Sequence, residues 1–431
     1  MMIPSMRQRI SFAVGFLLFF ASTVSPTLTT AAPAQGALIK IACPASAAPD
    51  HPCKAVYFYG HDGTRHAFPN EKVYFTWYAD FSSVQTVSTA FLASITLGPN
   101  VTYRPGVKMV KFQTLDKVYA VALGGSLRWI KTESAAASLY GTDWNKKVDD
   151  ISDVFFLDYR FGADIASAAD YDRSAELTVA TSIDDNLAST FRSERIVTSR
   201  GSFDVDVVRM QRDRFDMITD TGDTVDCHDG CTVKPLSAYV SENNASIGIH
   251  GTYFCPAEYP DCTGKTNSYH GSVYNTAAQE MLNAGDLPIH QGPLMASATD
   301  GRMFYFHRSS QFGASVSAFE AAQHVTLQAA LANYPSLVEN GSVIVESEAR
   351  LAETNPTLKS LRGGMGFDDH FVYLVIAHTA NVTDLAYVMQ TLGAKQALNL
   401  DGGGSAALIY GGASVVGPGR ALPNAIVFKQ K

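Results

Sequence analysis

Residues 396–408 read QALNLDGGGSAAL, and the rest of the chain is best interpreted outward from this stretch. Leu398 and Leu400 alternate with polar residues, as in a β-strand that buries one of its faces. By the same alternation, Asn399 and Asp401 share the opposite face and reach the carboxyl end of the strand together. The pattern therefore predicts a strand that presents polar groups at the edge of a core.

Three glycines and a hydroxyl follow this strand. Gly402, Gly403 and Gly404 can adopt positive φ and let a ligand approach the backbone closely. Their successive amide groups can form a concave anion site, to which Ser405 adds another donor. A carboxylate at Asp401, beside such a site, suits acid–base or electrostatic work on an anionic, hydroxylated substrate. The alternative is a glycine-rich β-turn without a ligand.

The preceding residues place this loop at the rim of a rigid core. Residues 371–377, FVYLVIA, form a near-continuous apolar run that is typical of a buried strand. Thr383 is the expected N-cap of a helix whose apolar residues recur at helical spacing up to Leu392, and Gly393 ends that helix. The expected order is strand, helix, strand, glycine loop, strand, an arrangement that often carries binding sites.

Two further segments indicate a family. The sequence NLDGGGS at 399–405, followed by a hairpin and then LPNAIVF at 422–428, resembles the C-terminal part of the phosphodiester glycosidase family. A weaker resemblance extends from residue 186 to residue 431. It implies an α+β fold, with a mixed-sheet catalytic domain over 186–431. It also implies hydrolysis of a bond between C1 of a sugar and a phosphate.

The resemblance also implies catalytic residues. Arg362 matches the arginine of the family's Arg-Thr-x-x-Gly segment, although Gly363 replaces the threonine. His250 stands where the family usually has asparagine, in a segment similar to Asn-Gly-Gly-Tyr-Phe. Together with Asp401, these two residues are the expected catalytic set. A guanidinium at Arg362 can bind phosphate through two parallel hydrogen bonds.

The expected substrate-binding residues surround this set. They are Asn399, Gly402, Gly403, Gly404, Ser405 and His378, the last because it ends a strand beside the one that carries Asp401. The expected substrate is a carbohydrate or a sugar phosphate. We expect no cofactor and no metal.

Two other functions stay open at this point. Ser405 can be a nucleophile in an esterase or phosphodiesterase, although no GxSxG motif surrounds it. Alternatively, the departures at His250 and Gly363 can mark a non-catalytic exported protein that binds glycans.

Composition narrows the class of protein. With 431 residues, of which 46% are hydrophobic and 17% charged, the chain can bury a large core and is expected to hold two domains. The formal net charge of −8 argues against nucleic acid as a partner. An anionic ligand therefore needs arginines close to its site.

The N-terminus has the pattern of a secretion signal over 1–34. Arg7 and Arg9 precede an apolar run at 10–20, and Ala32-Pro33-Ala34 resembles a cleavage site. We therefore expect a secreted or cell-surface protein without a membrane span after cleavage. An uncleaved anchor is the alternative.

Six cysteines fall into three local couples, and an exported chain is expected to oxidise them to disulfides, although six cysteines allow 15 connectivities. The couples are Cys43 with Cys53, Cys227 with Cys231, and Cys255 with Cys262. A metal site at 227–231 is the alternative.

Residues 35–162 contain a short internal repeat and are expected to form a β-rich repeat module. The segments 54–68 and 117–129 both read as strand, glycine turn, strand. They resemble repeat modules of bacterial exported or surface proteins, for which a cell-wall glycan is a possible partner. Trp77 and Trp129 either stack on sugars or fill a hairpin core. Residues 163–185 are expected to be a linker.

Overall fold

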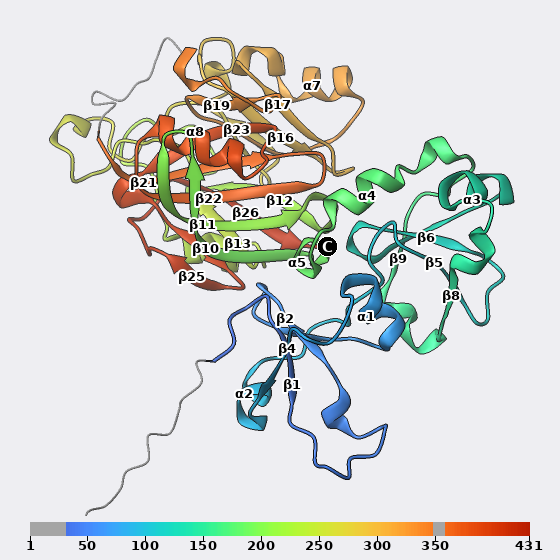
Figure 1. The fold of residues 1–431 in the computed structure, drawn as a ribbon. Helices are drawn as coiled ribbons and strands as arrows, with labels where there is room; N and C mark the ends of the chain where they lie inside the picture. Colours follow the sequence, from blue (N-terminus) through green and yellow to red (C-terminus); the bar gives the residue numbers. More distant parts are fainter. Residues whose placement is uncertain (1–31, 348–357) are drawn as a thin grey trace, which may run out of the picture.

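The computed structural model describes residues 32–347 and 358–431. Elements from residue 189 onward form one large layered body, and the earlier strands form two small sheets beside it (Figure 1). The expected secretion signal at 1–34 lies outside the described residues except for its last three. Across the described residues, no helix is both long and apolar enough to cross a membrane.

The largest sheet has seven strands. They are β10 (Ser189–Thr198), β11 (Gly201–Gln211), β19 (Ser336–Glu339), β20 (Ser342–Val343), β21 (Ser360–Phe367), β22 (Phe371–Ala380) and β23 (Gln396–Gly402). The strands are ordered β10-β11-β22-β21-β23-β19-β20, and every neighbouring pair is antiparallel. The strand that ends in Asp401 therefore lies inside this sheet, between β21 and β19.

Two five-stranded antiparallel sheets complete the large body. The first contains β12 (Phe215–Thr221), β13 (Ile247–His250), β24 (Leu408–Tyr410), β25 (Ala413–Val416) and β26 (Asn424–Gln430), ordered β12-β26-β13-β24-β25. The second contains β14 (Val273–Asn275), β15 (Glu280–Leu282), β16 (Leu294–Ala298), β17 (Met303–Phe306) and β18 (Leu327–Ala332), ordered β15-β14-β18-β16-β17. Three helices cover the sheets, namely α6 (Leu236–Glu242), α7 (Val316–Gln323) and α8 (Val382–Thr391).

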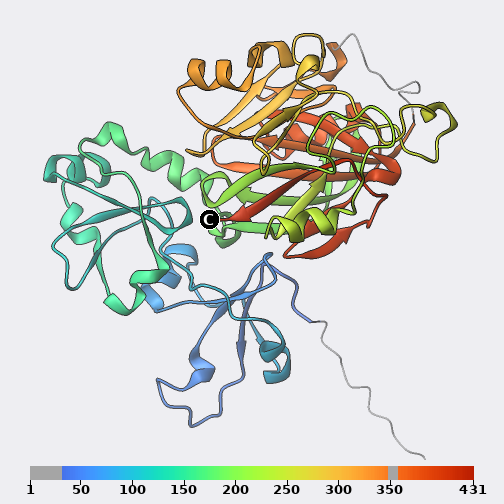
Figure 2. The same ribbon diagram turned by 180° about the vertical axis from the view of Figure 1, so that it is seen from behind.

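Hydrophobic residues on alternate faces of the strands hold these layers together. One face of the seven-stranded sheet packs against α8, and its other face shares a core with the two smaller sheets. Their outer faces are covered by α6 and α7. Leu398 and Leu400 lie in the shared core, as alternation predicts, whereas Ala397 packs toward α8. Figure 2 shows the same layers from behind, and the predicted α+β class is confirmed.

Helix α8 begins earlier than the sequence pattern predicts. Its N-cap is Asn381 rather than Thr383, because the Asn381 side chain accepts the N–H of Asp384 at 2.8 Å. The Asp384 carboxylate in turn accepts the N–H of Asn381 at 3.2 Å, which completes a capping box. The predicted stop is confirmed, since Gly393 follows the helix with φ of +97°.

The two N-terminal sheets, each taken with its helices, have the same order and pairing of elements. The first contains β1 (Leu38–Ile41), β2 (Tyr57–Tyr59), β3 (Arg65–Ala67), α1 (Glu71–Trp77), β4 (Val84–Val87) and α2 (Thr89–Ser94). The second contains β5 (Met109–Phe112), β6 (Tyr119–Ala122), β7 (Ser126–Trp129), α3 (Glu133–Tyr140), β8 (Val148–Ile151) and β9 (Arg160–Phe161). In both, a strand and a hairpin are followed by a helix and a strand that pairs in parallel with the first. Each copy of the short internal repeat, at 54–68 and at 117–129, thus forms the hairpin of a larger unit of strand, hairpin, helix and strand.

The two tryptophans of these sheets pack inward. Trp77 and Trp129 are partly buried against a core that both sheets share. The indole N–H of Trp77 donates to the carbonyl of Thr102 at 2.8 Å, and the ammonium of Lys117 lies 4.1 Å from the ring of Trp129. These contacts favour the hairpin-core interpretation over stacking on sugars.

The cysteine couples are confirmed. Disulfides join Cys43 to Cys53, Cys227 to Cys231, and Cys255 to Cys262. Asp223 lies beside Cys227 and Cys231, but the sulfurs of these two cysteines are bonded to each other and are not available as thiolate ligands. We therefore find no support for the metal alternative at 227–231.

The segment expected to be a linker is structured. Within 163–185 the chain forms α4 (Arg173–Val179) and begins α5 (Ile183–Asn186). Asp172 caps the first of these helices, since it accepts two backbone N–H groups at the start of α4. The four-part division of the chain into domains stays a prediction.

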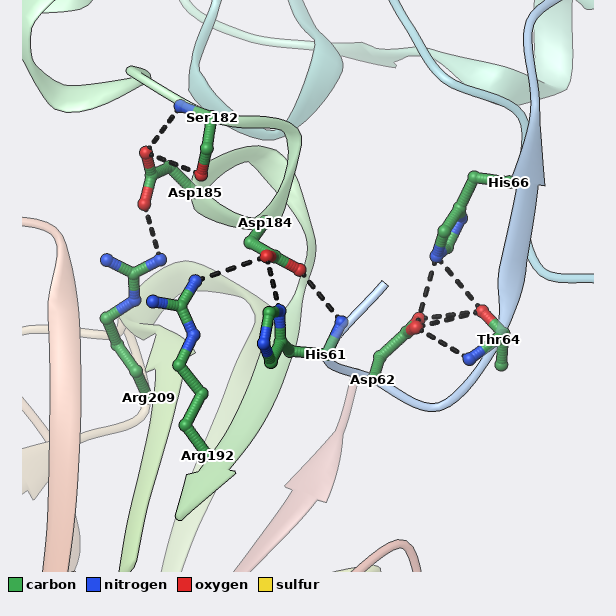
Figure 3. A network of polar contacts seen from close by, with 9 residues as sticks. All are labelled: His61, Asp62, Thr64, His66, Ser182, Asp184, Asp185, Arg192 and Arg209. Carbon is green, nitrogen blue, oxygen red and sulfur yellow. Dashed lines mark hydrogen bonds and ion pairs between the residues drawn. The ribbon is translucent and has the colours of Figure 1, made fainter. Parts of the chain in front are cut away.

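Helix α5 connects the N-terminal sheets to the large body (Figure 3). The Asp184 carboxylate accepts the backbone N–H of His61 at 2.9 Å, contacts its Nδ1 at 2.6 Å, and binds Nη2 of Arg192 on β10 at 3.1 Å. Asp185 next to it binds Nη2 of Arg209 on β11 at 2.6 Å. Consecutive side chains of one short helix thus bind both parts of the molecule.

The next residue of α5 continues this pattern, and a backbone contact adds to it. Asn186 accepts the N–H of Gly124 at 2.6 Å and donates to the hydroxyl of Thr102 at 2.8 Å, both in the N-terminal region. The N–H of Phe191, on the edge strand β10, donates to the carbonyl of His61 at 2.9 Å. We call α5 and these partners the α5 junction.

Replacing Asp184 with alanine should lower the free energy of unfolding by about 2 kcal/mol. The change removes charge-assisted hydrogen bonds to a nearly buried carboxylate and leaves two partners in the junction unpaired. Urea denaturation followed by circular dichroism measures it. Asp204→Ala is the control, because it breaks an exposed pair with Arg195 and should change stability by less than about 0.5 kcal/mol. Equal effects of the two substitutions would contradict a stabilising role for the junction.

Candidate functional site

Each residue of the glycine run 402–404, which begins at the last residue of β23, has different steric surroundings. A Cβ at Gly402 would lie 2.6 Å from the carbonyl oxygen of Leu361 and 3.3 Å from Nη1 of Arg362. Gly403 has φ of +56°, in the left-handed region that favours glycine. The first two glycines therefore allow a close approach and a backbone conformation that a side chain would disfavour.

Gly404 makes room for a second arginine that the sequence patterns do not reveal. A Cβ at Gly404 would lie 2.5 Å from Nη2 of Arg420, and the N–H of Arg420 donates to the Gly404 carbonyl at 2.9 Å. Arg420 follows the run only after the β24–β25 hairpin, so no local spacing predicts the contact. The glycine run thus has a guanidinium at each end, Arg362 beside Gly402 and Arg420 beside Gly404.

Asp401 is the penultimate residue of β23 and begins this loop. Its Oδ1 accepts the N–H of Gly402 at 2.8 Å. Burial raises the pKa of the Asp401 carboxyl above its ordinary value of 3.8, and a hydrogen bond from Ser405 and the positive charge of Arg420 offset part of this rise. A carboxyl with a raised pKa can exchange a proton closer to neutral pH than an exposed aspartate does.

His250, at the end of β13, is fully buried and holds the backbone of Asp401. Its Nε2 donates to the carbonyl oxygen of Asp401 at 2.7 Å, and its Nδ1 lies 3.2 Å from the carbonyl oxygen and 3.3 Å from the backbone nitrogen of Ala407. Because a carbonyl can only accept, Nε2 carries a proton. Burial lowers the pKa of the His250 imidazole, which favours the neutral form. The geometry supports a positioning role rather than direct proton transfer to a substrate.

The two departures from the family pattern meet in space. A Cβ at Gly363, on β21, would lie 2.2 Å from both Cε1 and Nε2 of His250 and 3.0 Å from the carbonyl oxygen of Asp401. No side chain fits there while the imidazole is in place. The histidine at 250 and the glycine at 363 are therefore sterically coupled, and one departure accounts for the other.

Asn399 is fully buried and supports two aromatic residues. Its Nδ2 donates to Oη of Tyr253 at 2.8 Å and to the carbonyl of Tyr334 at 3.1 Å. The two tyrosine rings lie 5.1 Å apart. Burial, followed by the negative charge of Asp401, raises the pKa of the Tyr334 hydroxyl. Local sequence patterns do not predict that these two tyrosines meet at Asn399.

The two remaining expected site residues differ in their surroundings. Ser405 is buried at 1% exposure and forms a hydrogen bond with Asp401, which argues against a role as an exposed nucleophile. His378, on β22, binds the carboxylate of Asp206 on β11 at 2.6 Å. Its described polar contact is therefore with β11 and not with the glycine run.

The C-terminal part of the chain is similar to a known protein family. Residues 263–429 match the family model described as phosphodiester glycosidase, as the resemblance predicted. The match includes Arg362, Asp401, the glycine run and Arg420, whereas His250 precedes it. No curated protein matches the chain in sequence.

Three solved structures are similar to part of the chain. The catalytic domain of zebrafish N-acetylglucosamine-1-phosphodiester alpha-N-acetylglucosaminidase, auto-inhibited by its pro-peptide, has 15% identity and a TM-score of 0.43, and the match covers 56% of this chain and 83% of that one. A hypothetical protein from Synechocystis has 14% identity and a TM-score of 0.38, with 57% and 62% covered. A protein from Burkholderia pseudomallei that has been proposed to be exported has 14% identity and a TM-score of 0.32, with 53% and 74% covered.

The coupling between His250 and Gly363 is testable with a double-mutant cycle. Gly363→Ala should lower the free energy of unfolding by about 1–3 kcal/mol, because the added methyl group overlaps the imidazole. In a His250→Ala background the same substitution should cost less, by about 1 kcal/mol or more. Thermal and urea denaturation of the four proteins measures the coupling.

Gly285→Ala is the matched control for this cycle. Its added Cβ would meet no heavy atom within 4 Å, so it should change stability by less than about 0.5 kcal/mol. Costs at position 363 that are the same with and without the imidazole would refute the steric coupling.

Proposed function

We propose that this protein hydrolyses the bond between the anomeric carbon of a sugar and a phosphodiester. The observation that carries the proposal is a half-buried carboxyl, Asp401, with a raised pKa, beside a glycine run with an arginine at each end. The match of 263–429 to the phosphodiester glycosidase model supports the reaction class. The products would be the free sugar and a phosphomonoester.

In the proposed reaction, Asp401 acts as general base. It accepts a proton from water as the water oxygen attacks C1, and the bond between C1 and the phosphate oxygen breaks with its electron pair leaving on the phosphate. Phosphate is a competent leaving group, so the site needs to stabilise its charge more than to protonate it. Arg362 is suited to this task because its guanidinium stays charged at any working pH.

Other residues would fix the geometry of this reaction. His250 holds the carbonyl of Asp401, and Asn399, two residues before Asp401 on β23, holds Tyr253 and Tyr334. We assign the tyrosine pair to the sugar side of the substrate, because aromatic faces pack well on pyranose rings. We also propose that the Gly403 and Gly404 amides face the phosphate, since Gly402 already donates to Asp401.

We further propose that the protein acts outside the cytoplasm, on a sugar phosphate or a related cell-surface glycan. Three disulfides support this location, because such bonds persist in oxidising compartments. For the N-terminal sheets, a cell-wall glycan is the proposed partner. Their exposed ring pair of Phe156 and Phe161, with centroids 5.2 Å apart, is a more accessible surface for it than the packed tryptophans.

Asp401→Asn should abolish release of free sugar from a p-nitrophenyl-type sugar-1-phosphodiester panel. In the wild type, kcat/KM should fall as the pH drops through the raised pKa of Asp401, so the acid limb should lie above pH 3.8. A general acid would instead lose activity as the pH rises. Turnover near the wild-type rate in the variant would overturn the assignment of Asp401.

The same variant should keep its fold. A raised carboxyl pKa in the folded state means that Asp401 favours folding when protonated, at low pH, and that this contribution is lost as the pH rises through the raised pKa. Removing the ionisable group should therefore leave stability at pH 7 unchanged or increased. A melting temperature measured at pH 7 separates lost chemistry from lost folding.

Arg362→Lys should raise KM for the phosphodiester by about tenfold, because an ammonium cannot form the two parallel hydrogen bonds of a guanidinium. The matched comparison is an aryl glycoside of the same sugar without phosphate, for which KM should hardly change. An equal loss on both substrates would indicate a structural role for Arg362.

A further inference from the structure

Arg420 is fixed to the glycine run by its backbone as well as by its side chain. It lies between β25 and β26, and its N–H donates to the carbonyl of Gly404 at 2.9 Å. Nη2 lies only 2.5 Å from the position that a Cβ of Gly404 would take. The side chain is about one-fifth exposed, so the guanidinium faces the loop but can still be reached from solvent.

A small disulfide-closed loop covers this arginine. Oε1 of Glu258 lies 3.1 Å from Nε of Arg420, and Oη of Tyr259 accepts a long hydrogen bond from Nη2 at 3.4 Å. Both residues lie between Cys255 and Cys262, whose disulfide closes the loop. Glu258 and Tyr259 are about half exposed, at 53% and 52%. An acidic oxygen therefore rests on the guanidinium from the solvent side.

This ion pair is of the kind that an anionic ligand can displace. Ion pairs with an exposed carboxylate contribute little to stability, because water and salt compete for both partners. A phosphate group offers several oxygens and can bind a guanidinium through two parallel hydrogen bonds. Arg362 offers a second guanidinium at the other end of the run, whereas Glu258 contacts Arg420 alone among the described ion pairs.

We propose that Arg420 is a second phosphate-binding residue, and that Glu258 occupies it until a phosphate group displaces the carboxylate. The assignment rests on the proposed function, because it places the phosphodiester along the glycine run with Arg362 at one end and Arg420 at the other. The ligand class is a phosphate monoester or diester. A phosphomonoester product carries more negative charge than the diester and binds the same two arginines, so it inhibits the reaction.

Isothermal titration calorimetry with inorganic phosphate at constant ionic strength tests the assignment without requiring turnover. Arg420→Gln should weaken phosphate binding by about tenfold or more, since it removes one charged donor group. Glu258→Gln should strengthen binding several-fold, because the competing negative charge is gone. Arg195→Gln, which removes an exposed arginine paired with Asp204 on β11, should leave binding unchanged.

Two further measurements keep the outcomes distinct. Arg420→Lys retains the positive charge and should bind phosphate with an affinity between those of the wild type and Arg420→Gln. Far-UV circular dichroism of each variant shows whether its fold is intact.

The proposal is overturned if the wild type does not bind phosphate, or if Arg420→Gln binds it as well as Arg195→Gln does. Weaker binding by Glu258→Gln would also overturn it, because Glu258 would then hold Arg420 in place rather than compete for it. Failure of the proposed hydrolysis would give a different pattern of results. If phosphate binding depends on Arg420 but the wild type releases no sugar from any phosphodiester, the anion site stands and the proposed hydrolysis fails.

Discussion

The hydrogen bond from the buried imidazole of His250 to the carbonyl of Asp401 is the constraint on which the site depends. It joins the end of β13, in one sheet, to the end of β23, in another, at the point where both strands leave the core. An unpaired carbonyl would be costly to bury there, so the bond fixes the spacing of the two sheets at their rim. The absence of a side chain at Gly363 is what leaves room for this imidazole.

Local pattern was enough to predict many of the elements. Alternation located β23, the apolar run at 371–377 located β22, helical spacing located α8, and the NLDGGGS motif located the carboxylate and its loop. These features depend on residues that are near one another in the sequence. Even so, the exact start of α8 was missed, because Asn381 forms a better capping box than Thr383 does.

What the sequence could not predict depends on contacts between distant segments. Arg420 contacts the glycine run although the β24–β25 hairpin separates them in sequence. Glu258, which contacts Arg420, lies in a loop more than 100 residues before the glycine run. The positioning role of His250 likewise depends on a carbonyl group far along the chain. Side-chain identity suggested that these residues are chemically useful, but only the packing of the sheets determines which groups they meet.

The α5 junction has a consequence for how the molecule acts at a surface. Two domains joined by a free linker reorient independently, so anchoring one of them says little about where the other points. Here Asp184, Asp185 and Asn186 bind both sides, and the end of the expected linker is itself a packed helix. The direction in which the glycine run faces is thus set relative to the N-terminal sheets. A surface or partner that binds the N-terminal sheets would therefore also determine the direction in which the candidate site faces.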